Sequence, residues 1–381
     1  MEKLLLSELS RVYGSLLSEL LEKLRRPPRR LYLRVNTLKT TRERVISMLS
    51  EEGIETYPDE EVDDAIFLEV KGPFNIECNT DKKIIVDDKT AISLLMGANL
   101  YRPGIRKWVA FEKGDRVLVV TGDNTPVACV ETTTSHYHAI NSEKGLVGVN
   151  IQSPYRAPSI AETKAYLKGL IYPQSLPSII TSHVLNPKPG ELIIDMNASP
   201  GGKTSHVVQL SIGRTRVIAI DRSEGKVKAL KSTLDWLGLN LNVLALPMDS
   251  RYIHLDLNLQ NKADKILIDP PCSNLGVRPI IAFNRTMRDI INLSNYQRQF
   301  LKAAYHVLKP GGILVYSTCT ITMLENEENI LYAVNELKYN TVEPDYAPPY
   351  AEKISYKGIT GYRFSPLSHD LPGYFIAVLS K

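Results

Sequence analysis

The stretch Ile268-Asp269-Pro270-Pro271-Cys272 ends an apolar run with an acid, two prolines and a thiol. A second apolar run, Val315-Tyr316-Ser317-Thr318-Cys319-Thr320, also ends on a thiol. Between them, a long helical pattern stops at Leu308-Lys309-Pro310-Gly311-Gly312. The order of strand, helix and strand predicts a parallel βαβ unit. Ligands of open α/β sheets bind at the carboxyl ends of the strands, so we expect Cys272 and Cys319 to face one crevice.

The alternation of strands and helices continues on the N-terminal side of this unit. Apolar runs predict strands over residues 192–195, 216–221, 242–246 and 265–269, and helical patterns cover 204–210 and 226–237. Strands that alternate with helices indicate a mostly parallel, doubly wound sheet. We therefore predict an α/β fold whose sheet domain spans residues 157–381.

An acidic residue closes or follows each predicted strand: Asp195, Asp221, Asp249 and Asp269. Because the carboxyl ends of the strands meet at one edge of such a sheet, these carboxylates are expected to surround a single crevice. Asp221 ends the second strand, where an acid typically accepts hydrogen bonds from ribose hydroxyls. Each aspartate alone is equally well explained as a turn or a helix cap. Four of them in register favour a nucleoside cofactor.

The turn Ala198-Ser199-Pro200-Gly201-Gly202-Lys203-Thr204 follows the first of these strands. Its glycines let the backbone approach a ligand closely. The turn matches neither G-x-G-x-x-G nor the phosphate-binding G-x-x-x-x-G-K pattern, which disfavours NAD and ATP. A cationic sulfonium cofactor has no pyrophosphate to bind, and an acid-rich crevice suits its charge.

Composition sets the outer bounds. The chain has 381 residues, enough for two or three domains, with 43% hydrophobic and 23% charged residues, which is normal for a globular protein. A net charge of +4 permits nucleic-acid binding without requiring it. The four cysteines do not resemble a disulfide framework, Cys78 and Cys129 are predicted to be structural, and the absence of a CxxC pair disfavours zinc or another metal. Without a signal peptide or membrane-spanning run, we expect a reducing cytoplasm.

The N-terminal region, residues 1–80, predicts a helix and a small α/β module. A leucine-rich helical pattern covers 1–24 and ends at Arg25-Arg26-Pro27-Pro28-Arg29-Arg30. These arginines either contact phosphates or form a solvated linker. A strand over 31–37, a helix over 41–53 and a strand over 65–70 follow.

Residues 81–156 contain short apolar runs separated by turn signals, which predict a small β-barrel. The segments Gly97-Ala98-Asn99-Leu100-Tyr101-Arg102-Pro103-Gly104-Ile105 and Lys113-Gly114-Asp115-Arg116-Val117 resemble a PUA domain, an RNA-binding module. An unrelated SH3-like barrel with scattered surface charge is the alternative. The candidate RNA-binding residues are one aromatic and four cations: Tyr101, Arg102, Arg106, Lys107 and Arg116.

The chain as a whole resembles the Sun-domain (Fmu/NSUN) RNA cytosine-5 methyltransferases. The motifs that carry the resemblance are Asp195 to Thr204, Asp269-Pro270-Pro271-Cys272-Ser273, Ser317-Thr318-Cys319-Thr320, Glu325-Asn326-Glu327, Arg363-Phe364-Ser365-Pro366, Pro372-Gly373-Tyr374-Phe375 and Arg34-Val35-Asn36-Thr37-Leu38. Met196, Asn197 and Met323-Leu324 depart from the usual pattern without touching a catalytic group. The resemblance implies a Rossmann-like class I methyltransferase fold. The inserted PUA-like barrel resembles the subgroup that methylates cytosine 72 (C72), near the 3′ end of the tRNA acceptor stem.

The resemblance also assigns roles to residues. Cys319 is expected to attack C6 of cytosine, Cys272 to assist release of the product, Asp269 to contact the N3/N4 edge of the base, and Lys203 to orient it. S-adenosylmethionine is the implied cofactor, held by Ala198, Ser199, Pro200, Gly201, Gly202, Lys203, Asp221, Arg222, Asp249 and Asp269. Asp221 would hold the ribose and Asp249 the adenine amino group. The implied partner is tRNA with its 3′ CCA end, bound by a monomer.

Two other functions remain open on the sequence. One is a ribosomal RNA cytosine-C5 methyltransferase, and the other is a non-catalytic RNA-binding or assembly factor. A DNA cytosine methyltransferase is disfavoured, because that family attacks with the thiol of its Pro-Cys motif and lacks a partner like Thr318-Cys319.

Overall fold

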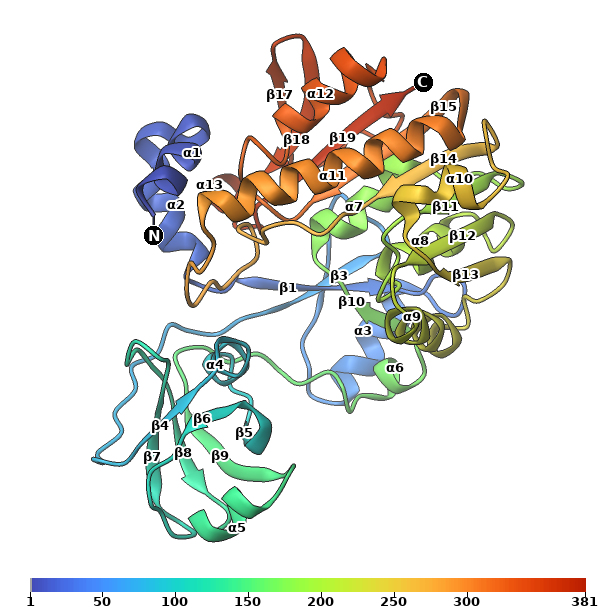
Figure 1. Ribbon diagram of the computed structural model, residues 1–381. Helices are drawn as coiled ribbons and strands as arrows, with labels where there is room; N and C mark the ends of the chain where they lie inside the picture. The colour runs from blue at the N-terminus through green and yellow to red at the C-terminus, as the bar shows by residue number, and fades with distance from the viewer. Residues whose placement is uncertain (1) are drawn as a thin grey trace.

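The computed structural model describes residues 2–381 and shows three parts, which Figure 1 colours from blue to red along the chain. A nine-stranded sheet with helices on both faces forms the largest part, a helical hairpin and a four-stranded sheet lie beside it, and a six-stranded barrel lies apart at the lower left of the view. Within residues 2–381, no helix has both the length and the apolar character needed to cross a bilayer.

The nine-stranded sheet confirms the predicted α/β fold. Its strands are β11 (Leu192–Asp195), β12 (Arg216–Asp221), β13 (Val243–Pro247), β14 (Ala263–Ile268), β15 (Leu308–Thr318), β16 (Asn340–Thr341), β17 (Glu352–Tyr356), β18 (Ile359–Phe364) and β19 (Tyr374–Ser380). The order is β13-β12-β11-β14-β15-β19-β18-β17, with β16 paired to β19. The strands from β11 to β15 run parallel, as predicted. The C-terminal strands add an antiparallel edge that the sequence did not indicate.

Helices cover both faces of this sheet. They are α7 (Leu176–Leu185), α8 (Gly202–Leu210), α9 (Glu224–Leu237), α10 (Ile253–Asp256), α11 (Met287–Val307), α12 (Glu327–Leu337) and α13 (Pro366–His369). Side chains along a strand alternate between faces, so neighbouring residues enter different cores. Ile193 and Val315 pack against α7, α8 and α9, whereas Ile194 and Leu314 pack against α11 and α12. The carboxyl ends of β11, β12, β14 and β15 are thereby left to form the site.

The small N-terminal sheet is built from strands that precede the barrel in the sequence and one strand that follows it. Its antiparallel order is β10-β1-β3-β2, from β1 (Arg30–Val35), β2 (Tyr57–Pro58), β3 (Ala65–Glu69) and β10 (Ile171–Pro173), with helices α3 (Arg42–Glu51) and α6 (Lys164–Leu167). The sequence predicted a turn over 171–175 and a longer helix over 161–170. The turn prediction was wrong, because Leu33 of β1 pairs with Pro173 and draws that short segment into the sheet, whereas the helix is confirmed only over Lys164–Leu167.

The N-terminal helix is broken in two. α1 (Lys3–Tyr13) and α2 (Leu17–Leu24) are joined by a 3-10 turn, Gly14–Leu16, instead of the single helix predicted over 1–24. Met1 lies outside the described residues. Gly14 has φ +49°, a left-handed conformation that glycine adopts without strain and that ends α1. The hairpin buries its leucines against Leu275 and Ile321, which lie close in sequence to the two candidate cysteines.

The barrel forms, as predicted, from the strands between residues 83 and 152. Its strands are β4 (Lys83–Val86), β5 (Leu100–Tyr101), β6 (Ile105–Lys107), β7 (Arg116–Val120), β8 (Pro126–Thr132) and β9 (Leu146–Gln152), with helices α4 (Asp88–Leu95) and α5 (His136–Asn141). The strand order is β5-β9-β8-β7-β4-β6. Asp87 caps α4 by accepting a hydrogen bond from the Thr90 N–H.

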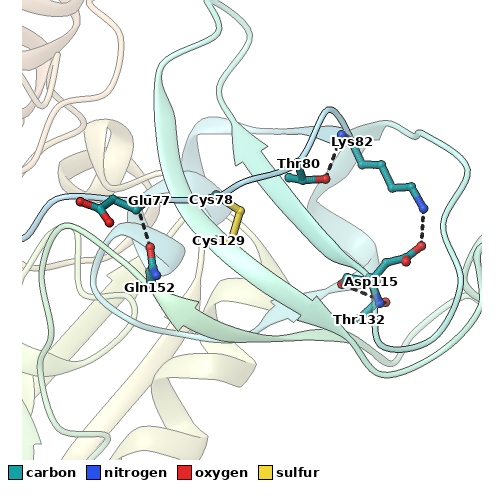
Figure 2. The surroundings of a disulfide bond; sticks show 8 residues. All are labelled: Glu77, Cys78, Thr80, Lys82, Asp115, Cys129, Thr132 and Gln152. Atoms are coloured by element: carbon teal, nitrogen blue, oxygen red, sulfur yellow. Dashed lines mark hydrogen bonds and ion pairs between the residues drawn. A yellow bond between two sulfur atoms is a disulfide. The ribbon is translucent and has the colours of Figure 1, made fainter.

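A disulfide joins Cys78 to Cys129, which agrees with the structural role predicted for both residues but corrects the expectation that the cysteines are not part of a disulfide framework. Cys78 lies on the extended segment that leads into the barrel, and Cys129 is a buried residue of β8 (Figure 2). The same segment is tied down by a hydrogen bond from the Glu77 N–H to Gln152 and by an ion pair between Lys82 and Asp115. The two cysteines are 51 residues apart, a separation that gives no signal in the sequence. Because these two cysteines are oxidised, they do not support the prediction of a reducing compartment.

Removing this disulfide should loosen the barrel. The variant Cys78→Ser/Cys129→Ala is expected to lose about 3–4 kcal/mol in the free energy of barrel unfolding, because the bond closes a long loop in the unfolded chain. Denaturant titration with and without reductant measures this loss. Thiol counting in denaturant should find two reactive cysteines before reduction and four after it. Four thiols before reduction would show that the bond does not form.

Candidate active site

Two thiols meet at the carboxyl edge of the large sheet. Cys272 follows β14, Cys319 follows the adjacent parallel strand β15, and their Sγ atoms lie 3.3 Å apart. Cys272 is buried, whereas Cys319 is only partly covered. Both line a cavity of about 570 Å³. The structure therefore brings the two cysteines to one crevice, as the βαβ pattern predicted.

Asn274 holds both thiols. Its Oδ1 accepts hydrogen bonds from Cys272 Sγ at 3.3 Å and from Cys319 Sγ at 3.0 Å. The residue has φ +60°, a left-handed conformation that asparagine tolerates better than most side chains. The hydrogen bond with Cys319 is the main cause that raises the pKa of Cys272 well above its ordinary value, followed by burial. Cys272 is therefore protonated at neutral pH in the resting protein.

Asp269 and Lys203 form an ion pair beside the thiols. Lys203 Nζ lies 2.5 Å from Asp269 Oδ2, and Ser317 Oγ donates to Asp269 Oδ1 at 3.2 Å. Burial alone would lower the pKa of the Lys203 ammonium, but the Asp269 carboxylate and the Tyr374 hydroxyl raise it above its ordinary value. Lys203 therefore remains a cation, paired with the Asp269 carboxylate. Ser317 and Tyr374 belong to motifs quoted from the sequence, yet neither was assigned a role.

The predicted cofactor residues divide between two adjoining cavities. Ser199, Pro200, Asp221, Arg222, Asp249 and Asp269 line the cavity of about 570 Å³. Ala198, Gly202 and Lys203 line a neighbouring cavity of about 240 Å³, which shares Ser199, Pro200 and Asp269 with the first. Gly201 lines neither cavity as described. A Cβ on Gly201 would lie 3.0 Å from Leu230 of α9, so this glycine serves the packing of α8 on α9.

Two of the predicted cofactor residues, Asp221 and Asp249, line the larger cavity. Asp221 is buried at the end of β12 and accepts hydrogen bonds from the Ser199 N–H at 3.2 Å and the Arg222 N–H at 2.8 Å. Asp249 accepts from Arg251 Nε at 2.9 and 3.1 Å. That hydrogen bonding is the main cause that lowers the pKa of Asp249 below its ordinary value. Both groups are thus fixed in orientation before any ligand arrives.

Glu325 is a buried acid beside the thiols to which the sequence assigned no role, because an acid just before a helix ordinarily stabilises the start of that helix. It lies before α12, is fully buried, and connects the loops that carry the two cysteines. Its carboxylate accepts from the Ser273 N–H at 2.9 Å, Ser273 Oγ at 2.6 Å, Thr322 Oγ1 at 2.9 Å and Gln297 Nε2 at 2.9 Å. Thr320 Oγ1, next to Cys319, donates at 3.3 Å. The Glu-Asn-Glu motif and the hydroxyl residues after each cysteine were the available signal.

Replacing Glu325 by alanine should misplace both thiols. The buried donors of Ser273 and Gln297 would lose their acceptor, and an error of about 1 Å in a reacting atom costs roughly 100-fold in rate. We expect kcat to fall by about that factor while KM changes little. Glu325→Gln keeps an acceptor oxygen and should recover part of the rate. Glu336→Ala, an exposed change, is the matched control. Equal rates for Glu325→Ala and this control would contradict the prediction.

The five candidate RNA-binding residues of the barrel do not all lie together on one unpaired surface. Tyr101 and Lys107 are exposed, and the Arg102 guanidinium lies over the Trp108 ring. Arg106 is paired with Asp87, so its charge is partly used. Arg116 begins a different strand, β7, where it pairs in register with Glu131. Tyr101, Arg102 and Lys107 therefore remain the best placed of the five.

A second polar cluster lies away from the thiols. Asp64 Oδ1 is 2.9 Å from His183 Nε2 of α7, and Oδ2 is 2.6 Å from His206 Nε2 of α8. Gln209 Nε2 also donates to Oδ2. The three ligand atoms lie within 4.8 Å of one another, close enough for a metal ion, although the sequence indicated no such group. Both carboxylate oxygens already accept hydrogen bonds, so we interpret the cluster as the polar connection between the N-terminal module and α7 and α8.

Comparison with known proteins identifies the family to which this fold and site correspond. A model described as 16S rRNA methyltransferase RsmB/F matches residues 182–380, an RsmF/B-like ferredoxin-like domain matches 2–75, and a PUA domain matches 82–150. The tRNA (cytosine(72)-C(5))-methyltransferase of Pyrococcus horikoshii is 36% identical over 96% of this chain and 92% of its own length. Human tRNA (cytosine(72)-C(5))-methyltransferase NSUN6 is 31% identical over 93% of this chain and 83% of its own. The crystal structure of NSun6 from Pyrococcus horikoshii with SFG superposes with a TM-score of 0.92 at 34% identity, covering 100% and 98% of the two chains.

Fold, paired thiols and these matches define an enzyme that methylates RNA at C5 of cytosine. Within that class, the chain belongs to the RsmB/F family, in the branch that carries both a ferredoxin-like and a PUA domain. The resemblance identified from the sequence is confirmed, and so is the PUA assignment against the SH3-like alternative. The alternative of a non-catalytic binding factor is set aside, because the family is enzymatic.

Proposed function

We propose that this chain transfers a methyl group from S-adenosylmethionine to C5 of cytosine 72 in the acceptor stem of tRNA. The observation that carries the chemistry is the 3.3 Å pair of thiols beside an acid-lined cavity. The support for the target comes from relatives: those named as cytosine-72 enzymes match nearly the whole chain, barrel included.

The larger cavity suits S-adenosylmethionine. Its volume of about 570 Å³ lies in the usual range for small-molecule sites. Asp221 and Asp249 would hold the ribose and the adenine amino group, and the surrounding carboxylates suit a positive sulfonium. A relative of known structure was solved with SFG, an analogue of this cofactor. S-adenosylmethionine supplies an electrophilic methyl group when bound.

Cys319 begins the reaction as the nucleophile. The thiolate adds to C6 of the cytosine, an S–C6 bond forms, and the electrons of the C5=C6 bond make C5 nucleophilic. Charge builds on the N3/N4 edge of the base during this step. Asp269, held by Lys203 and Ser317, would accept a hydrogen bond from the N4 amino group of that edge, and the Lys203 ammonium beside it would offset the negative charge. C5 in this state is able to accept a methyl group, which unactivated cytosine does poorly.

Cys272 completes the reaction. After methylation, the C5–H bond must break so that C5=C6 re-forms and Cys319 leaves as a thiolate. The main cause of the raised pKa of Cys272 is its hydrogen bond with Cys319. Once Cys319 is bonded to the base, that cause is removed, while burial still raises the pKa of Cys272. Its thiolate then takes the C5 proton. Formation of the Cys319–C6 bond thereby favours ionisation of Cys272, the group whose thiolate allows that bond to break.

The target site and the barrel fit together. Extruding a base from a stem costs a few kcal/mol, least at a fraying end such as the end of the acceptor stem. The PUA domain would hold the single-stranded CCA tail, with Tyr101 as a stacking surface. Every group in the mechanism comes from one chain, which supports a monomer. We place this activity in the cytoplasm and assign it no metal.

Methylation assays with defined RNAs test the proposal. Transcripts of whole tRNA, tRNA carrying uridine at position 72, and tRNA lacking CCA are incubated with protein and S-adenosylmethionine carrying a labelled methyl group. Label should enter only the first transcript efficiently, and bisulfite sequencing should locate it at position 72. Label at another tRNA cytosine, or only in ribosomal RNA fragments, would overturn the assigned target and favour the ribosomal alternative.

A further inference from the structure

Four exposed arginines lie between the N-terminal hairpin and β1 with no acidic partner. Arg25, Arg26, Arg29 and Arg30 fall within six residues, and their side chains form no ion pair with any residue in the range 2–381. Other cations on the surface of this chain do have carboxylate partners, as Lys23, Arg106 and Lys309 do. Unpaired charge of one sign attracts a polyanion.

The segment that carries them is held rigidly. Arg278, with a side chain only 2% exposed, donates from Nε to the Lys23 carbonyl at 2.9 Å and the Arg26 carbonyl at 3.1 Å. Its Nη2 donates to the Pro27 carbonyl, and its Nη1 donates to Asp370 at 2.7 Å. Pro27 and Pro28 are buried. The sequence left a solvated linker open as the alternative, and a flexible linker would not have its backbone carbonyls bound in this way.

The arginines border a cleft of about 540 Å³. Its polar lining includes Lys23, Arg26, Arg29, Arg278 and His369, against the acids Glu69 and Asp370. Asp370 already accepts from Arg278 and from the Arg29 N–H, so its charge is satisfied inside the protein. The cleft therefore presents positive charge to solvent.

The cleft lies between the two RNA-facing parts of the protein. Gly72, Pro73 and Tyr155, from the two segments that lead into and out of the barrel, form one wall. Arg278, on the loop that follows Cys272, forms another. Six residues separate Arg278 from Cys272, a distance of at most roughly 20 Å along the chain. Figure 1 shows the hairpin and α13 on one side of this junction and the barrel on the other.

We propose that this cleft binds the sugar-phosphate backbone of the RNA substrate between the barrel and the thiols, with Arg26 and Arg29 as the principal phosphate contacts. The proposal rests on the RNA methyltransferase function and adds a binding surface to it. Such contacts fix the position of an RNA strand without reading its bases. They would hold the acceptor end in place while its terminal base is extruded.

Salt-dependent binding tests the proposal. The variant R26A/R29A is compared with R214A/R216A, which removes the same charge from exposed positions at the opposite, amino-terminal end of the strands. Affinity for tRNA is measured without cofactor between 50 and 200 mM salt. R26A/R29A should weaken binding by about 10- to 100-fold at low salt and reduce the slope of log affinity against log salt by about 2. R26K/R29K should keep the wild-type slope.

The remaining arms separate the possible failures. R26A/R29A should weaken binding of a scrambled RNA of the same length equally, and kcat at saturating tRNA should stay within about twofold of wild type. An unchanged slope, or a loss equal to that of R214A/R216A, would overturn the cleft. Weakening confined to the natural sequence would show base reading in its place. Absence of methylation by the wild-type protein would instead refute the proposed function and leave the binding result standing.

Discussion

Replacing Cys319 by alanine is expected to abolish methyl transfer while leaving RNA and cofactor binding intact. Removal of a covalent nucleophile costs on the order of 10⁴- to 10⁶-fold in kcat, because no other group activates C5 of cytosine. Cys319 is the more exposed of the two thiols and opens on the larger cavity, so its loss should not disturb the core. Incorporation of labelled methyl groups into tRNA under single-turnover conditions measures the effect.

Selective alkylation provides an independent check on this assignment. Iodoacetamide at pH 8 should modify Cys319 faster than Cys272, since Cys272 is buried and its pKa is raised. Mass spectrometry of the two peptides compares the rates. Cys319→Ala activity above about 1% of wild type would mean that Cys272 is the attacking thiol and that the roles are reversed.

Replacing Cys272 by alanine is expected to trap the reaction partway. Cys319 can still add to the base and C5 can still be methylated, but the group proposed to take the C5 proton is missing. Turnover should fall by roughly 100-fold or more, as expected for loss of a general base. A protein–RNA adduct that survives denaturing electrophoresis should accumulate at the same time.

The double variant Cys272→Ala/Cys319→Ala is the control for this experiment. It should form no adduct, because the bond is to Cys319. If the Cys272→Ala variant forms no adduct and turns over at the wild-type rate, Cys272 has no role in the mechanism. A slow variant without adduct would instead place the defect before attack, in the positioning of Cys319 by Asn274.

The sequence predicted those features that depend on local pattern. Parallel strands that end in acids, and two that lead directly to thiols, follow from periodicity and from the rule that ligands bind at carboxyl ends. The sequence could not place Glu325, because a carboxylate before a helix ordinarily stabilises that helix. Only the folded chain shows that it accepts hydrogen bonds from Ser273 and Gln297 instead.

The remaining errors share one physical cause, which is long-range contact. Residues 171–173 are a strand because β1 offers a free edge, and Cys78 meets Cys129 because the linker crosses β8. Neither pairing leaves a trace in the neighbouring residues. Gly14 is different, because a glycine inside an otherwise continuous helical pattern is itself a local signal for a helix end.

The barrel is mounted on two chain segments rather than one. Lys71 and Arg156, on the outgoing and returning segments, pair as an antiparallel bridge just before the barrel, and both segments continue into the same small sheet. A paired stalk cannot swing as a single tether does, so the span from the barrel to Cys319 is set by the fold. If the barrel binds the end of an RNA, this fixed distance determines how far from that end the nucleotide that reaches Cys319 lies.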